Sequence, residues 1–206
     1  MYDGVPKKLY CMNYFAHLVL SQPTVASTVG NLLGDFARGV DQANLPLAVR
    51  AGLENHRAVD RFTDSHPLVV EMKTRFSPQR RRFAGIALDM YFDHLLVNDW
   101  HEFEQGTSEQ AMKVFYQRIK AGQSLMPGRN MQLVTGRMIE YDWFGRYRET
   151  KSIAKALDRV AGRIRFANNF DNAIEDLQYH HEDIRTAFFE FYPQLKSHIT
   201  ALAIEK

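Results

Sequence analysis

The chain has 206 residues, of which 45% are hydrophobic and 24% charged, with one cysteine and a formal net charge of +2 from 26 basic and 24 acidic residues. This composition is typical of a globular domain and excludes a disordered, collagen-like or coiled-coil chain. A single cysteine excludes an intrachain disulfide framework and a cysteine-based zinc site, and a charge so close to zero argues against a general nucleic-acid binder.

The sequence shows no sign of membrane insertion or secretion. No apolar run approaches the roughly 20 residues needed to cross a bilayer, and the opening residues MYDGVPKK are not followed by the apolar core of a signal peptide. We therefore expect a cytoplasmic protein. Residues 1–11 differ in character from the rest of the chain, so we interpret them as an N-terminal extension, with Met12 as a candidate functional start and residues 12–206 as one domain.

Apolar residues recur at helical spacing throughout this domain, and no segment alternates as a strand would. Thr107 and Gln110 have the spacing of a capping box, and Pro193 is expected to break or kink the last helix. Gly30 and Gly34, four residues apart, predict the close approach of a second helix. We predict an all-α, single-domain helical bundle of about seven or eight helices. After a short apolar segment over 13–21, the expected helices cover 25–40, 47–64, 67–76, 79–97, 107–122, 128–144, 149–166 and 171–204.

Two carboxylates lie four residues apart in the most apolar segment of the chain. Asp89 and Asp93 share one face of the helix predicted over 79–97, among leucine, methionine and aromatic residues. Burial of two like charges costs several kcal/mol each unless a partner compensates for it. A divalent cation, which binds hard oxygen ligands, is one such partner. Pairing with arginines, or a solvated position, is the alternative.

His56 and Asp60 form a second pair at helical spacing, and both can reach one ion from the same face of the helix predicted over 47–64. Arg57 and Arg61 form the neighbouring stripe, and guanidinium groups suit phosphate binding. The alternative is a solvated helix face with ion pairs inside the helix.

Two further segments each place ionisable residues on an apolar background. Asp35 interrupts an apolar and small-residue run, and Arg38, three residues later, is close enough to pair with it or to contact a substrate phosphate. His17 lies in an apolar stretch, where a single histidine is more often a hydrogen-bonded core residue than a metal ligand.

Taken together, these segments predict a bundle in which His and Asp side chains from separate helices converge on a metal centre. Without cysteine the ligand set is nitrogen and oxygen, which favours Mg²⁺, Mn²⁺ or Fe²⁺ over a structural zinc. Such an ion with arginines nearby suits phosphoester hydrolysis, because it lowers the pKa of bound water and neutralises phosphoryl oxygens.

Four motifs succeed one another in chain order: Asn13-Tyr-Phe-Ala-His17-Leu, Gly30-Asn-Leu-Leu-Gly-Asp35-Phe-Ala-Arg38-Gly39, His56-Arg57-x-x-Asp60-x-x-Thr63-Asp64 and Leu88-Asp89-x-x-x-Asp93-His94-x-Leu. Together they resemble the acyl carrier protein phosphodiesterase (holo-ACP hydrolase) family, from near Met12 to the end of the chain. The resemblance implies an all-α fold related to the HD-type metal-dependent phosphohydrolases, although this chain has no contiguous His-Asp dipeptide.

The resemblance also implies an activity, namely removal of the 4'-phosphopantetheine group from the serine of holo-acyl carrier protein, with Mn²⁺ or Mg²⁺ as cofactor. It implicates Asp35 in the metal site. We expect Asp35 and His94 to act in catalysis, the histidine by protonating the leaving serine alkoxide, and Arg38 and Arg57 to hold nonbridging phosphate oxygens. The expected metal ligands are His17, Asp35, His56, Asp60, Asp89 and Asp93.

Acyl carrier proteins are acidic, so their partner is expected to present a locally basic surface. The densest basic cluster lies over 73–82, and we expect Arg80, Arg81 and Arg82 to contact the carrier protein, the alternative being a solvated basic surface with no partner. Two other functions stay open at this point: an HD-type phosphohydrolase acting on a nucleotide or another small phosphodiester, and a non-catalytic module that binds carrier proteins.

Overall fold

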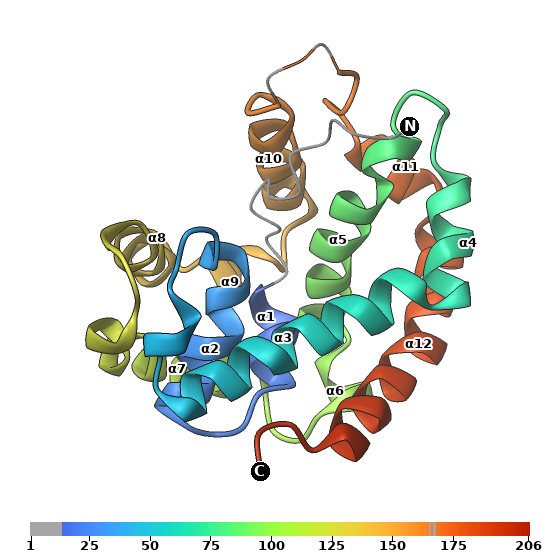
Figure 1. The fold of residues 1–206 in the computed structure, drawn as a ribbon. Coiled ribbons are helices and arrows are strands. Elements are labelled where there is room, and N and C mark those ends of the chain that lie inside the picture. Colours follow the sequence, from blue (N-terminus) through green and yellow to red (C-terminus); the bar gives the residue numbers. More distant parts are fainter. Residues whose placement is uncertain (1–13, 165, 167) are drawn as a thin grey trace.

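The computed structural model describes residues 14–164, 166 and 168–206, and this part of the chain forms helices and no strand, which confirms the all-α prediction (Figure 1). The proposed extension over 1–11 and Asn13 of the first motif lie outside the described residues. The α-helices are α1 (Tyr14–Val19), α2 (Val25–Leu33), α3 (Leu47–Ser65), α4 (Pro67–Arg75), α5 (Ala84–Asn98), α6 (Trp100–Phe103), α7 (Ser108–Ala121), α8 (Arg129–Glu140), α9 (Trp143–Arg146), α10 (Thr150–Ala161), α11 (Ile174–Tyr179) and α12 (His181–Leu202).

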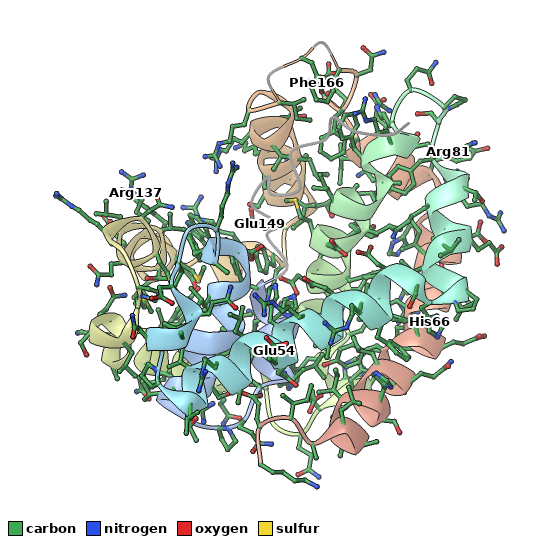
Figure 2. The ribbon with its side chains drawn as sticks, in the orientation of Figure 1. Glu54, His66, Arg81, Arg137, Glu149 and Phe166 are labelled. Atoms are coloured by element: carbon green, nitrogen blue, oxygen red, sulfur yellow. The ribbon has the colours of Figure 1, made fainter. Side chains whose placement is uncertain are left out.

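Helix α5 is the centre of the bundle. It contacts α1, α4, α10, α11 and α12, and most of its residues are buried, as a helix that is apolar on several faces must be. Aromatic and aliphatic side chains from these helices fill the space around it in one continuous core (Figure 2). None of the helices in the described ranges has the length and apolar character that a bilayer-spanning helix needs.

Helices α2 and α3 pack against each other at two glycines. A Cβ atom on Gly30 would overlap the carbonyl oxygen of Val49 and would lie 2.7 Å from the Cα of Gly52. A Cβ atom on Gly52 would in turn lie 2.8 Å from the carbonyl oxygen of Ser27. The close approach predicted from Gly30 is therefore confirmed, and the partner is the backbone of α3.

Three predicted helices end earlier than expected, and the one predicted over 149–166 is helical, as α10, only to Ala161. The segment predicted over 25–40 is helical only to Leu33 and then tightens into a 3-10 turn, η1 (Gly34–Phe36). The segment predicted over 128–144 divides into α8 and α9, because Asp142 adopts a left-handed conformation with φ of 47° and its side chain accepts a hydrogen bond from the amide of Gly145. The capping box at Thr107 and Gln110 is present as predicted.

The last helical segment is interrupted at His180 rather than at Pro193. Helix α12 continues through Pro193, so the predicted break at this proline is wrong. Proline removes one backbone hydrogen bond from the helix interior. The apolar face of α12, with Phe188, Phe191 and Leu195 fully buried around the proline, outweighs this loss.

Glycine-to-alanine substitutions at Gly30 and Gly136 test the packing of α2 on α3. Gly30→Ala is expected to lower the free energy of unfolding by about 1–3 kcal/mol, because its methyl group meets backbone atoms that cannot rotate away. Gly136→Ala in α8 meets nothing within 4 Å and should raise stability by about 0.5–1 kcal/mol through helix propensity. Urea denaturation measures both; equal effects would contradict this account.

Candidate metal centre

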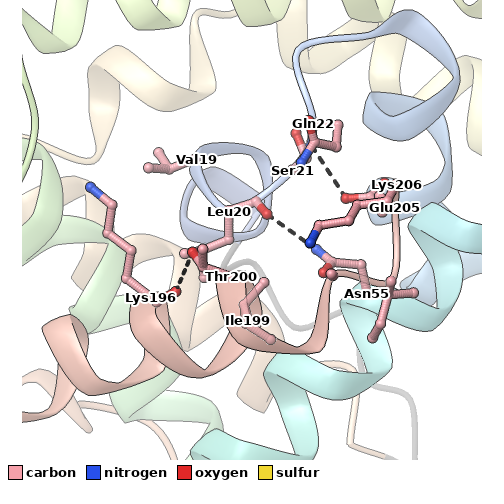
Figure 3. A pocket seen from close by; sticks show the side chains of 12 residues that line it. Val19, Leu20, Ser21, Gln22, Asn55, Lys196, Ile199, Thr200, Glu205 and Lys206 are labelled. Carbon is pink, nitrogen blue, oxygen red and sulfur yellow. Dashed lines mark hydrogen bonds between the residues drawn. The ribbon is translucent and has the colours of Figure 1, made fainter.

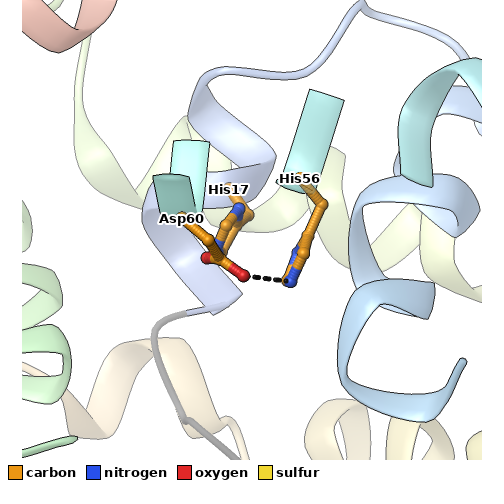
Figure 4. Close-up of side chains that lie close together, drawn as sticks. All are labelled: His17, His56 and Asp60. Atoms are coloured by element: carbon orange, nitrogen blue, oxygen red, sulfur yellow. Dashed lines mark ion pairs between the residues drawn. The ribbon is translucent and has the colours of Figure 1, made fainter. Parts of the chain in front are cut away.

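Three of the predicted ligands converge where α1 meets α3 (Figure 4). His17 comes from α1, and His56 and Asp60 lie one turn apart on α3. Nε2 of His17 is 3.3 Å from Oδ1 of Asp60, and Nε2 of His56 is 3.2 Å from Oδ2 of the same carboxylate. One ligand atom from each residue lies within 4.8 Å of the others, and this is the one such group of three among the described residues.

The two imidazole rings are stacked inside the protein. Their centroids are 3.9 Å apart with an interplanar angle of 17°, and both rings are buried while the carboxylate of Asp60 is about half exposed. Within the described part of the chain, Nδ1 of His17 has no hydrogen-bond partner, and its Nε2 faces the Asp60 carboxylate at the ion-pair distance of 3.3 Å. A fully buried polar group without a hydrogen bond is rare and calls for another partner, such as an ion.

The position of His56 is set by its other ring nitrogen. Nδ1 lies 2.7 Å from the backbone carbonyl oxygen of Asn31. A carbonyl oxygen only accepts, so Nδ1 carries the proton. Nε2 faces the Asp60 carboxylate: the protonated ring donates to it, and the neutral ring has its Nε2 lone pair available to a cation. This carbonyl–histidine arrangement is the usual outer-shell support of a metal-binding histidine. Gly34 makes room for the ring, because a Cβ atom there would overlap the imidazole.

The protonation states of the three side chains depend on one another. Burial, aided by the neighbouring His56, lowers the pKa of His17 to about 4, so His17 is neutral at pH 7. Burial raises the pKa of Asp60, but the close contacts with the two histidines outweigh it and hold that pKa below its usual value. Burial lowers the pKa of His56, yet Asp60, Asp35 and the Asn31 carbonyl outweigh this effect, so the pKa of His56 is raised.

The donor set fits a divalent ion. Ligand atoms about 2.0–2.2 Å from one ion are separated from each other by roughly 3.0–3.5 Å, and the two nitrogen–oxygen distances fall in this range. Two imidazoles and one carboxylate also leave coordination positions open for water or substrate, as catalytic sites require.

Asp93 is predicted as a ligand, but its carboxylate holds the backbone of α1. Its two oxygens accept hydrogen bonds from the amides of Phe15 and Ala16, at 2.9 and 2.8 Å. Burial raises the pKa of Asp93 well above its ordinary value, against the opposing effect of these two hydrogen bonds. The structure therefore places Asp93 outside the three-residue group and makes it a support for the short helix that carries His17.

The structure places Asp35 and Asp89 outside the group of three but within electrostatic reach of its surroundings. Asp35 lies in η1, directly after Gly34, and its charge contributes to raising the pKa of His56. Asp89 is half-buried on α5 and contributes to raising the pKa of Asp93. Neither carboxylate is within the 4.8 Å that joins the group of three.

His94 lies on α5 and is bound to another part of the bundle. Its Nδ1 donates to the backbone carbonyl of Tyr147 at 2.7 Å, and its ring stacks on Tyr91 with centroids 5.1 Å apart. Burial lowers the pKa of His94. The ring is therefore neutral at pH 7, and the structure does not bring it into the group of three.

The two arginines expected to bind phosphate have different surroundings. Arg57 donates to the carboxylate of Glu54 and, at 2.9 Å, to the side chain of Gln42. Arg38 is exposed, forms no ion pair with a described residue, and lies on the wall of a groove of about 520 Å³. Apolar residues line much of this groove: Phe36, Val40, Leu45, Pro127 and Met131.

The basic cluster expected to contact a partner is partly neutralised within the protein. Arg80 donates to the backbone carbonyl of Asp171 and to the carboxylate of Glu175. Arg81 donates to the carbonyl of Phe76, and the guanidinium of Arg82 lies 4.9 Å from the ring centre of Phe166. Arg81 and Arg82 are exposed, whereas the side chain of Arg80 is only 18% exposed.

Sequence analysis did not single out the residues that support the ligands. Asn31 and Asn55 are both buried, and Asn55 precedes His56 directly. An asparagine at a core-facing position of a predicted helix is the signal that points to such a role, because a buried amide needs hydrogen-bond partners.

Substitution of Asp93 by alanine tests whether this carboxylate supports the structure of α1 rather than binding a metal ion. Asp93→Ala leaves the amides of Phe15 and Ala16 without an acceptor, so the free energy of unfolding should fall by about 2–6 kcal/mol at roughly 1–3 kcal/mol per amide. Asp93→Asn keeps one acceptor and should lose less. Urea denaturation in EDTA measures the effect without any contribution from metal, with exposed Asp171→Ala as the control. Unchanged stability of Asp93→Ala would contradict the support role.

Comparison with known proteins gives a consistent result. The family model for acyl carrier protein phosphodiesterase matches residues 12–195. Proteins named acyl carrier protein phosphodiesterase are similar along most of their length: one from Serratia proteamaculans is 34% identical over 89% of this chain and 95% of its own, and one from Photorhabdus laumondii is 32% identical over 89% and 93%.

One from Escherichia coli is 31% identical over 94% of this chain and all of its own. No solved structure matches the chain. The four motifs and the all-α bundle agree with these similarities, and the family match spans most of the residues that form the bundle. The chain belongs to the acyl carrier protein phosphodiesterase family.

Proposed function

We propose that this protein is a metal-dependent phosphodiesterase that removes the 4'-phosphopantetheine group from the serine of holo-acyl carrier protein, in the cytoplasm. The observation that carries the proposal is the convergence of His17, His56 and Asp60 on one point. The names of the relatives supply the substrate, and the geometry supplies a site suited to phosphoester hydrolysis.

His17, His56 and Asp60 would hold the ion, and Asp35 is the nearest further candidate because its charge acts on His56. A bound divalent ion would lower the pKa of a water molecule and neutralise charge on the phosphoryl group. Imidazole suits transition metals, whereas Mg²⁺ prefers oxygen ligands, so two histidines favour Mn²⁺ over Mg²⁺. The kinship with HD-type enzymes and the ligand role of Asp89 stay predictions.

The remaining side chains divide into substrate binding and proton transfer. Arg38 is the better candidate for a phosphate oxygen, because the guanidinium of Arg57 already binds Glu54 and Gln42. The groove beside Arg38 starts at Phe36, next to Asp35, and has apolar walls that suit a pantetheine arm. His94 would supply a proton to the leaving serine if the substrate reaches α5. Because the His94 ring is neutral, it would first have to take up that proton.

Docking of an acidic carrier protein would use the exposed part of the basic cluster. Arg81 and Arg82 are exposed near the start of α5, whereas Arg80 is occupied by Asp171 and Glu175. We therefore propose that Arg81 and Arg82 contribute more to carrier-protein binding than Arg80 does.

Loss of the Asp60 carboxylate tests the metal centre. The protein incubated with holo-acyl carrier protein and Mn²⁺ should convert it to the apo form, as measured by mass spectrometry, and EDTA should stop the reaction until Mn²⁺ is restored. Asp60→Asn should lower the rate on the order of 100-fold or more, because a catalytic ion supplies several kcal/mol. The exposed Asp171→Asn is the matched control. Full activity of Asp60→Asn would disprove the assignment.

Arg38 and Arg137 provide a second comparison. Arg38→Ala should lower kcat/KM for holo-acyl carrier protein roughly 10- to 100-fold, since a hydrogen bond to a charged group is worth about 1.5–3 kcal/mol. Arg137→Ala, an equal loss of charge on exposed α8, should have no effect (Figure 2). Equal rates for the two variants would remove Arg38 from the substrate site.

A further inference from the structure

A network of buried side-chain amides lies directly behind the metal centre. The side chain of Asn55 donates to Oδ1 of Asn31 at 3.0 Å and to the backbone carbonyl of Leu20 at 3.2 Å. The side chain of Asn31 donates to the carbonyl of Ser27 at 3.1 Å and to Oε1 of Glu205 at 3.3 Å. Both asparagines are at most 2% exposed.

This network joins the three segments that build the centre. Leu20 follows α1, which carries His17; Asn31 lies on α2, and its backbone carbonyl holds His56; Asn55 lies on α3, one residue before His56. Asn55 thus connects the ends of α1 and α2 to the helix that carries the other two ligands. A shift of any one segment would break at least one buried hydrogen bond, which costs about 1–3 kcal/mol for the group left unpaired.

Glu205 closes the network from outside. After α12 the chain turns at Ala203, which adopts the left-handed conformation with φ of 50°, and Glu205 then reaches α2. Its carboxylate accepts a hydrogen bond from the side chain of Asn31. It also accepts one from the backbone amide of Gln22 at 3.2 Å (Figure 3). A left-handed conformation costs a residue with a Cβ atom roughly 1–2 kcal/mol, so the contacts made beyond the turn must outweigh it.

A cavity of about 240 Å³ lies beside these residues, between the loop after α1 and the end of α12. Its lining includes Ser21, Asn55, Ile199 and Glu205. Packing is therefore incomplete beside Asn55 and Glu205, which line the cavity, and on this side their hydrogen bonds hold these two side chains.

We propose that Asn31, Asn55 and Glu205 are positioning residues of the metal centre: they fix the carbonyl that orients His56 and hold α1 at the distance at which His17 meets Asp60. The inference rests on the proposed metal site. These residues touch neither metal nor substrate, and their effect passes through His56 and the end of α1.

The test measures Mn²⁺ affinity by competition with a chelator, without substrate. Asn55→Ala should weaken Mn²⁺ binding about 10- to 100-fold, as loss of outer-shell support generally does. Glu205→Ala should weaken it less, and Glu205→Gln should recover most of the affinity because its amide oxygen still accepts one hydrogen bond. Glu190→Ala, an equal loss of charge on the exposed side of α12, is the control and should bind as the unaltered protein does.

A second readout separates this inference from the proposed function. ¹⁵N NMR of the imidazole rings in metal-free protein reports whether His56 keeps its proton on Nδ1. Circular dichroism measures whether each variant is folded. If Asn55→Ala does not fold, the comparison is made with Glu205→Ala alone. The inference predicts that the variants change the His56 tautomer balance whether or not Mn²⁺ binds. Folded variants with the tautomer and Mn²⁺ affinity of the unaltered protein would overturn it, whereas absence of Mn²⁺ binding by the unaltered protein would overturn the metal centre.

Discussion

Two stacked imidazoles buried against one carboxylate are the constraint around which this part of the bundle is arranged. The rings of His17 and His56 are only 3.9 Å apart, which requires α1 and α3 to approach closely. Gly34 provides the space for one ring, and Asn31 fixes its orientation through a backbone carbonyl. Burying polar groups is unfavourable without partners, so such an arrangement is retained where function depends on it.

Two glycines, one in α2 and one directly after it, show how the fold serves this site. Gly30 brings the backbone of α2 against Gly52 of α3, and one turn later Gly34 faces His56. The same spacing therefore sets the distance between the helices and admits the ligand. Because backbone contacts allow little sliding, the register of α2 on α3 determines where the Asn31 carbonyl lies relative to His56.

Most of the helices could be predicted from apolar periodicity, because their buried faces repeat at the helical period. The errors have local causes that periodicity does not contain. The helix predicted over 25–40 stops at Leu33, and α12 passes through Pro193 because buried aromatic residues around it outweigh one lost hydrogen bond. The break at His180 has no proline or glycine to mark it.

The site was predicted in part. His56 and Asp60 could be paired from their spacing on one helix, whereas the meeting of His17 with them depends on tertiary packing that no local pattern encodes. Asp89 and Asp93 have the same spacing, yet Asp93 accepts hydrogen bonds from the backbone of α1. The same four-residue spacing therefore predicts a metal ligand in one helix and not in the other. The element packed opposite each carboxylate decides whether that carboxylate faces backbone amides or other ligands.

The lengths of α1 and α3 have a consequence for how the centre assembles. His56 and Asp60 lie on a helix of 19 residues, but His17 lies on one of 6, which is too short to be stable in isolation. A cation bound by all three side chains would therefore stabilise α1 along with the site, by the linkage that couples ligand affinity to local folding. Slower exchange of the amide hydrogens of α1 than of the other short helices would be the signature of a loaded enzyme.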